Sequence, residues 1–182
     1  MGKKKSLFIS VILVMLLIVA VVTATSAFLA TITNEGSIGT GSGMLDINYT
    51  KPASLTGNFI PSTDRSGGLT TTAKASLKSG SENALFNMYL TPTALTNLNI
   101  PALKWEVEGI RDGIIVCSKN GDFSDATVDT PIKIIEGCLL STTETTFNIY
   151  VWLDSSLIQS AVGGSSFGAK IGADSVPITG DF

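Results

Sequence analysis

The sequence contains no histidine in its 182 residues. Histidine is the side chain most often used as a general base and as a metal ligand in proteins. Its absence excludes a Ser-His-Asp triad, a Cys-His dyad and an HExxH zinc helix. No other pairing of a nucleophile with a base is evident. The sequence therefore predicts a protein that is not an enzyme, with no catalytic residues, no cofactor and no metal site.

Positive charge is also scarce. The chain has 12 lysines and arginines against 15 aspartates and glutamates, and three of the lysines, Lys3 to Lys5, lie together near the start. Without residues 1–27 the net charge is 9 − 15 = −6. The nine remaining basic residues are scattered along the chain and form no stripe, which argues against a nucleic-acid partner.

Long apolar runs are absent except for one uncharged stretch of 18 residues, Leu7 to Ala24. A membrane-spanning helix needs about 17–25 such residues. The run follows Lys3 to Lys5 and is followed by the small residues Thr25, Ser26 and Ala27. A basic start, an apolar centre and a small-residue exit are the layout of a secretory signal peptide.

We predict that the signal peptide comprises residues 1–27 and is cleaved after Ala27, with a cut after Ala24 as the second choice. The alternative is an uncleaved membrane anchor. In both cases residues 28–182 lie outside the cytoplasm, in the extracellular space or at the cell surface. Contact with the membrane is then confined to residues 7–24, before cleavage or in an uncleaved chain.

Cysteine occurs only twice, as Cys117 and Cys138, which are 21 positions apart. Export would take them to a compartment in which disulfides persist. An even count in an exported chain predicts a bridge between the two. Two buried free thiols are the alternative, and a metal site would need further ligands that the sequence does not contain.

Residues 28–182 are numerous enough for one domain with a hydrophobic core. Apolar residues recur mostly with a period of two, as expected for half-buried strands. About nine or ten such segments follow one another at a spacing of about 8–12 residues, separated by turn residues. We predict an all-β fold, an antiparallel β-sandwich of the jelly-roll type, preceded by the signal or membrane helix. The inward-facing residues are expected to include Leu103, Trp105, Val107, Phe147, Ile149, Val151, Leu153, Phe86, Met88, Leu90, Ile132, Ile134, Ile135, Phe167, Ala169, Ile171 and Ala173.

Local signals predict several boundaries. Pro92 is expected to end a strand, because proline cannot donate to the ladder. Asn120-Gly121 is expected to form a turn. Residues 154–162 are expected to form a short helix, with Asp154 or Ser155 as its N-cap and Gly163 as its stop.

A few polar and aromatic residues are candidates for a site. The acidic side chains Asp122, Asp125 and Asp129 suit a solvated turn better than a calcium site, because their spacing fits no EF-hand. Glu106 and Glu108 are expected on the solvent side of their strand. Tyr150 and Trp152 either close the outer face of the sandwich, the preferred interpretation, or bind a sugar or partner protein.

Several short motifs occur in the order that a known family shows. They are Thr25-Ser-Ala-Phe-Leu-Ala-Thr-Ile-Thr-Asn34, Gly43-Met-Leu-Asp-Ile47, Ile60-Pro-Ser-Thr-Asp64, Leu85 to Leu90, Leu103-Lys-Trp105, Ile149-Tyr-Val-Trp-Leu-Asp154 and Phe167-Gly-Ala-Lys-Ile171. In this order and spacing the chain resembles TasA and camelysin-like proteins over most of residues 7–173. It departs from them at Leu29, where the family often has an aromatic residue, and by the added pair of cysteines.

The resemblance implies a secreted jelly-roll protein that builds fibres of an extracellular matrix or biofilm. In such fibres the N-terminal strand of one subunit completes the sheet of the next. The protease activity described for camelysins is not carried over, because the chain lacks histidine.

We therefore expect a secreted structural subunit whose main partner is itself, in a homopolymer, with other matrix or surface proteins as further partners. Residues 28–33 are the expected exchangeable strand, with Phe28, Ala30 and Ile32 on one face. The glycine-rich stretch from Gly36 to Gly43 would act as its tether. The alternative is a monomeric surface module that binds carbohydrate or acts as an adhesin.

Overall fold

The computed structural model describes residues 38–39, 46–81, 83–157 and 165–178. Within these ranges the chain forms strands, one 3-10 helix and loops, and it contains no α-helix. The predicted all-β class is confirmed, whereas the predicted signal or membrane helix lies outside the described residues. The elements are β1 (Ile38–Gly39), β2 (Asp46–Thr50), β3 (Leu55–Gly57), η1 (Arg65–Gly67), β4 (Leu69–Leu77), β5 (Ala84–Thr96), β6 (Leu103–Arg111), β7 (Ile114–Asp122), β8 (Ile132–Leu139), β9 (Thr145–Leu153) and β10 (Ser166–Pro177).

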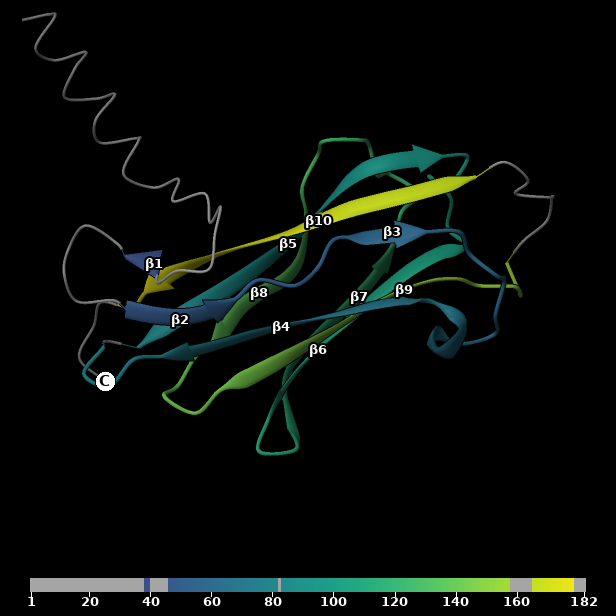
Figure 1. The fold of residues 1–182 in the computed structure, drawn as a ribbon. Coiled ribbons are helices and arrows are strands. Elements are labelled where there is room, and N and C mark those ends of the chain that lie inside the picture. The colour runs from purple at the N-terminus through teal and green to yellow at the C-terminus, as the bar shows by residue number, and fades with distance from the viewer. Residues whose placement is uncertain (1–37, 40–45, 82, 158–164, 179–182) are drawn as a thin grey trace, which may run out of the picture. The chain divides into compact units, whose positions relative to one another are not determined.

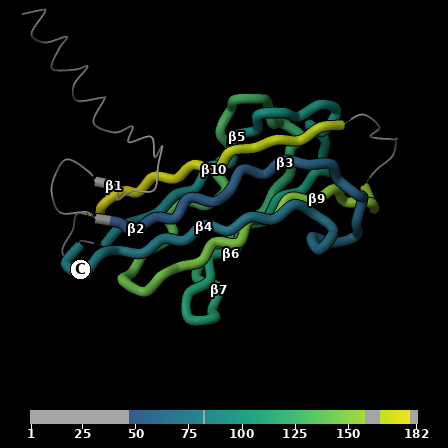
Figure 2. The backbone as a smooth tube through the Cα atoms, in the orientation of Figure 1, coloured from purple at the N-terminus to yellow at the C-terminus, as the bar shows by residue number. Residues whose placement is uncertain are grey.

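The strands form two sheets (Figure 1). The six-stranded sheet has the order β1-β2-β4-β9-β6-β7, and the four-stranded sheet has the order β3-β10-β5-β8. Neighbouring strands are antiparallel in both sheets. The chain passes from one sheet to the other between β2 and β3, which follow one continuous path in Figure 2.

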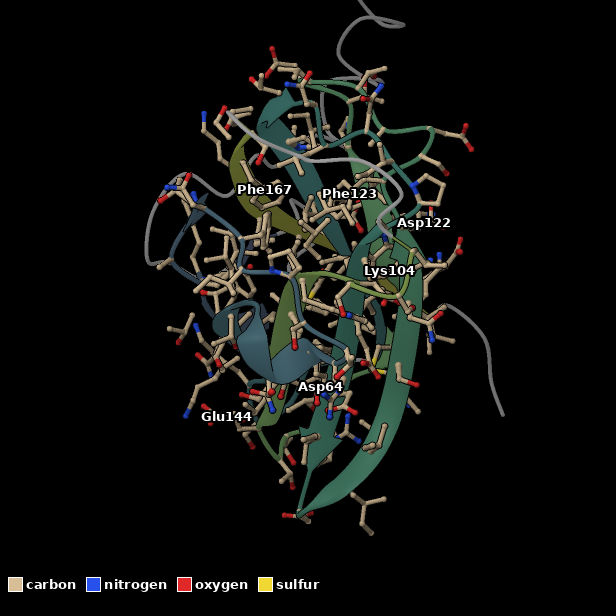
Figure 3. The ribbon with its side chains drawn as sticks, turned by 90° about the vertical axis from the view of Figure 1, so that its right-hand side faces the viewer. Asp64, Lys104, Asp122, Phe123, Glu144 and Phe167 are labelled. Carbon is tan, nitrogen blue, oxygen red and sulfur yellow. A yellow bond between two sulfur atoms is a disulfide. The ribbon has the colours of Figure 1, made fainter. Side chains whose placement is uncertain are left out.

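The two sheets share one hydrophobic core. Phe147 of β9 and Phe86 of β5 are fully buried, and their ring centroids lie 5.1 Å apart. Side chains of the two sheets are therefore in contact with each other. Phe167 and Phe123 pack edge to face at 5.5 Å and extend this core (Figure 3). All the predicted inward-facing residues are buried except Ile132, which is half-buried. The predicted antiparallel sandwich architecture is thus confirmed.

A bulge explains why two consecutive isoleucines of β8 are buried. Met88 pairs with Ile135 and Tyr89 pairs with Lys133, which leaves Ile134 as an extra residue between them. An extra residue shifts the alternation of a strand by one position. Ile134 and Ile135 therefore both face the core.

The prediction that Pro92 ends its strand is wrong. β5 continues through Pro92 to Thr96, because a bulge at Thr93 accommodates the proline: Ala169 pairs with Pro92 while Gly168 pairs with Ala94. Bulges are among the few places where a sheet tolerates proline. The carbonyl of Pro92 still accepts a hydrogen bond, from the backbone N–H of Asp129 at 2.8 Å.

The prediction of a turn at Asn120-Gly121 is also wrong. Both residues belong to β7 and pair with β6, and a Cβ atom on Gly121 would lie 2.6 Å from the ring of Trp105. Glycine is needed there so that the tryptophan can pack. The actual turn is Asp112-Gly113, where both φ angles are positive, 52° and 76°. This is the backbone of a type I′ hairpin.

The helix predicted for residues 154–162 does not begin where expected. Asp154 forms a β-bridge with Ser62, and a turn follows it through Leu157. The Asp154 carboxylate accepts a hydrogen bond from the backbone N–H of Ser156 at 2.9 Å, which closes a local turn instead of capping a helix. Residues 158–162 lie outside the described part.

Tyr49 of β2 is a buried residue whose hydroxyl has no hydrogen-bond partner among the described residues. Burial raises its pKa. An unpaired buried hydroxyl costs free energy, so we predict that Tyr49→Phe raises the free energy of unfolding by about 1 kcal/mol. The matched control is Tyr89→Phe, because the Tyr89 hydroxyl donates to Asp174 at 2.8 Å and its loss should destabilise. Urea unfolding of both variants checks the prediction, and a less stable Tyr49→Phe variant would contradict it.

Candidate functional site

One seam of the sandwich is closed by a covalent bond. Cys117 of β7 and Cys138 of β8 form a disulfide, with an S–S distance of 2.08 Å and a Cα–Cα distance of 5.8 Å, which is in the usual range. The bond joins the edge strand of one sheet to the edge strand of the other. Lys119 reinforces the seam by donating to the carbonyl of Lys133 at 3.0 Å. The predicted bridge is confirmed, and it indicates a non-reducing environment.

At the opposite seam, much of the edge of β10 has no partner strand among the residues that the structure describes. β3 pairs with only three residues of β10, Phe167 to Ala169. The next eight, Lys170–Pro177, pair with β5 on one side and with no described strand on the other. In the other sheet, β1 pairs with just two residues of β2, Asp46 and Ile47. Among the described residues, both sheets therefore present unpaired backbone groups at this seam.

The predicted strand-exchange residues Phe28, Ala30 and Ile32 and the predicted cleavage site at Ala27 lie outside the described residues. So does the apolar run of residues 7–24. Among the residues that the structure describes, no helix is both long enough and apolar enough to cross a membrane.

Figure 3 shows the molecule from a second side, with Asp64 of the loop at residues 61–68 labelled. This loop lies over the outer face of the six-stranded sheet and carries Arg65. The Arg65 guanidinium lies 3.0 Å from Glu106 and 2.9 Å from Glu108, and it stacks 4.4 Å from the ring centroid of Tyr150.

The expectation of ordinary solvent exposure for Glu106 and Glu108 therefore needs correction. Their side chains are 28% and 13% exposed, and one arginine pairs with both. Tyr150 is covered by that arginine, in line with the interpretation that it closes the outer face of the sandwich. Arg65 was missed in the sequence because it meets these partners only through the fold.

Beyond the Arg65 cluster, the same face has a hollow of about 460 Å³ next to Trp152. Lys104 of β6 lies in the middle of its lining. In the sheet, Lys104 is paired with Trp152 of β9 on one side and with Asp122 of β7 on the other. Figure 3 shows Lys104 and Asp122 beside each other, and their charged groups are 3.5 Å apart. Glu106, Asn120 and Asp154 complete the polar lining.

An Asp-x-Ser motif fixes the two aspartates of this hollow. Asp122 accepts hydrogen bonds from the backbone N–H and hydroxyl of Ser124, at 3.0 and 2.6 Å, and Asp154 does the same with Ser156, at 2.9 and 2.6 Å. These hydrogen bonds to the charged form lower the pKa of both carboxyls. The same Asp-x-Ser motif thus occurs at residues 122–124 and 154–156, which is visible in the sequence.

We predict that Ser156→Ala raises the pKa of the Asp154 carboxyl toward the ordinary value of 3.8. The substitution removes the hydroxyl donor and leaves the backbone donor in place. A folded-state pKa below the unfolded value stabilises the protein above the unfolded pKa, and this contribution is lost as the pH falls through the folded pKa. Carboxyl NMR titration checks the pKa, with Ser155→Ala as the matched control. An unchanged Asp154 pKa in Ser156→Ala would contradict the assignment.

The acidic loop after β7 does not gather its carboxylates. Asp122 is engaged with Ser124 and Lys104, and Asp129 sits in a left-handed backbone conformation, at φ 63°, with its N–H bonded to Pro92. Within the described ranges no three acidic or sulfur ligands come close enough together to hold a metal ion. The loop is a hydrogen-bonded turn in this structure.

No family model matches the chain. A comparison with curated proteins likewise gives no match.

Proposed function

We propose that the protein is an exported structural subunit that polymerises into a fibre of the cell surface or extracellular matrix. The observation that carries the proposal is the open seam beside β10, opposite the seam that the disulfide closes. Unpaired strand edges are templates for pairing with another chain, and natural proteins usually protect them. The disulfide supports function outside the reducing cytoplasm. The resemblance to TasA and camelysin-like proteins remains a proposal based on the order of short motifs.

In the proposed assembly, residues 28–33 of one subunit pair with the free edge of β10 in the next. The available edge, Lys170–Pro177, is eight residues long, and the expected strand has six. β10 presents Ile171 and Ala173 to the core at this edge. An incoming strand that places Phe28 and Ile32 on the same side would extend the core, and each side chain would contribute about 1.5–3 kcal/mol.

The direction of the chain favours this arrangement. β1 starts at Ile38, five positions after Thr33, and pairs with the beginning of β2, an edge of the open seam. Only four residues of sequence thus separate the proposed exchangeable strand from β1. Pairing with a neighbour instead of with its own sheet would make a head-to-tail polymer that does not close.

We also propose that the sandwich is of the jelly-roll type, as the family resemblance implies.

A competition assay tests the proposal. Purified residues 28–182 should form sedimentable polymer whose light scattering rises with concentration. A synthetic peptide of residues 28–34 in excess should occupy the free β10 edges and reduce polymer formation, whereas a peptide of the same composition in scrambled order should not. Polymer formation that is insensitive to the peptide would contradict strand exchange. A stable monomer at all concentrations would favour the monomeric binding module.

A further inference from the structure

We propose that the hollow beside Trp152 binds a hexosamine unit of a polysaccharide, with the sugar ring on the indole and its ammonium group near Asp122 and Asp154. This site lies on the outer face of the six-stranded sheet. It is separate from the open seam, so it goes beyond the proposed polymerisation and does not depend on it.

The position of Trp152 supports a role in contact with a ligand. Successive side chains of a strand point to opposite faces: Val151 and Leu153 are buried in the core, and Trp152 lies between them on the outer face, half-buried. Gly68 packs closely against its base, because a Cβ atom there would lie 2.7 Å from the Trp152 Cβ. A large aromatic ring anchored at its base offers contact area at little cost in conformational entropy.

The sequence interpretation was that Tyr150 and Trp152 both close the outer face of the sandwich. This role fits Tyr150 but not Trp152. Arg65 covers Tyr150 at 4.4 Å. Trp152 instead borders a hollow that is lined mostly by polar residues, with Trp105 and Gly121 as the other apolar members. A hollow that combines aromatic residues with several convergent polar groups matches the usual composition of a small-molecule site. A sugar has an apolar face of C–H groups and a rim of hydroxyls, which suits these two kinds of wall.

The charges of the lining select among sugars. Lys104 contributes one positive charge, and Glu106, Asp122 and Asp154 contribute three negative charges, so the sum is +1 − 3 = −2. Glu106 shares Arg65 with Glu108, and Asp122 is paired with Lys104. Asp154 is in no ion pair with another described residue. A net negative hollow repels uronic acids and attracts a cation.

Both carboxylates are ionised at neutral pH. The hydrogen bonds from Ser124 and Ser156 lower the pKa of Asp122 and Asp154. The same bonds fix the orientation of each carboxylate in advance, so a ligand ammonium need not order them. A hexosamine with a free amine supplies the matching cation, whereas N-acetylation removes its charge.

Calorimetric titration of the exported protein with three hexasaccharides tests the inference: a glucosamine oligomer, its fully N-acetylated form and a glucose oligomer. We expect the glucosamine oligomer to bind at least ten-fold more tightly than the other two. Trp152→Ala should weaken its binding at least ten-fold, and Trp152→Phe should retain most of the affinity.

The contribution of charge is tested by a matched pair of variants. Asp154→Asn should weaken glucosamine binding several-fold, whereas Asp125→Asn, which removes the same charge from an exposed position outside the hollow, should leave it unchanged. Thermal unfolding of each variant verifies that the fold is intact. The inference is overturned if no oligomer binds, if the neutral oligomers bind equally well, or if folded Trp152→Ala binds like the unaltered protein. None of these results bears on fibre formation, which is measured separately.

Discussion

Replacing Cys117 and Cys138 together with serine is expected to lower the free energy of unfolding by about 3 kcal/mol. The disulfide spans a sequence separation of 21 residues. In the chain-entropy description, a loop of that size removes about 3 kcal/mol of conformational freedom from the unfolded chain. For a domain of this size the midpoint of thermal unfolding should fall by about 6–12 °C.

In the folded protein the bond ties the edge strands β7 and β8 of the two sheets together. Gly109 also shapes the site: a Cβ atom there would lie 2.6 Å from the Cys117 sulfur and 3.0 Å from the ring of Phe147. Denaturant unfolding of the double variant measures the loss, with reduced unaltered protein as a second sample and Ser118→Ala as the control. Equal stability of the oxidised and reduced proteins would show that the bridge contributes nothing.

Deleting residues 28–34, with the predicted signal peptide retained, is expected to abolish polymer formation and leave a secreted, folded and less stable domain. The deletion removes the strand that would pair with β10 but none of the described core. Loss of Phe28 and Ile32 would remove about 1.5–3 kcal/mol of burial each, together with the ladder hydrogen bonds. Sedimentation of the purified variant checks polymer formation, and circular dichroism checks the fold.

Two double variants test whether assembly depends on the side chains of this strand and not only on its presence. Phe28→Asp with Ile32→Asp places charges on the face that would be buried and should prevent assembly. Thr31→Asp with Thr33→Asp places the same charges on the opposite face, where they should be tolerated. Polymers of normal stability from the deletion, or equal effects of the two pairs, would show that residues 28–33 are not the joint.

The alternation of strands was predictable from the sequence because one face of each strand is buried and the other is not. Leu103, Trp105 and Val107 face the core as expected, and so do Phe147 and Ile149. Burial imposes the period of two directly on the residues, so local pattern is sufficient there. The disulfide was predictable for a different reason: an even number of cysteines in a chain that is expected to be exported favours a bridge.

The errors arose where tertiary contacts override local preference. Pro92 would be expected to end a strand because it lacks a backbone N–H donor, but a bulge at Thr93 lets the strand continue without that donor. Asn120-Gly121 is a strong turn signal, but Gly121 is required by the ring of Trp105. The exception at Pro92 depends on β10, which is distant in the sequence, so no local pattern reveals it. The turn of the β6–β7 hairpin did have a local signal in Asp112-Gly113, because Asp-Gly is as typical of a two-residue hairpin turn as Asn-Gly.

The candidate sites were predictable only in part. Trp152 was a candidate for contact with a sugar or partner, whereas Asp122 and Glu106 were expected to be solvated and Asp154 to cap a helix. The hollow that brings them together depends on the register of β6, β7 and β9. Arg65 lies in a stretch that reads as a polar turn, and its ion pairs with Glu106 and Glu108 form only when the loop folds over the sheet. The open seam is likewise a property of strand order.

Electron microscopy of the purified mature protein, with its mass determined on the same sample, tests the central claim most directly. The account predicts filaments made of a chain that begins at Phe28. Monodisperse single particles of that chain, at concentrations well above those reached at a cell surface, would contradict it.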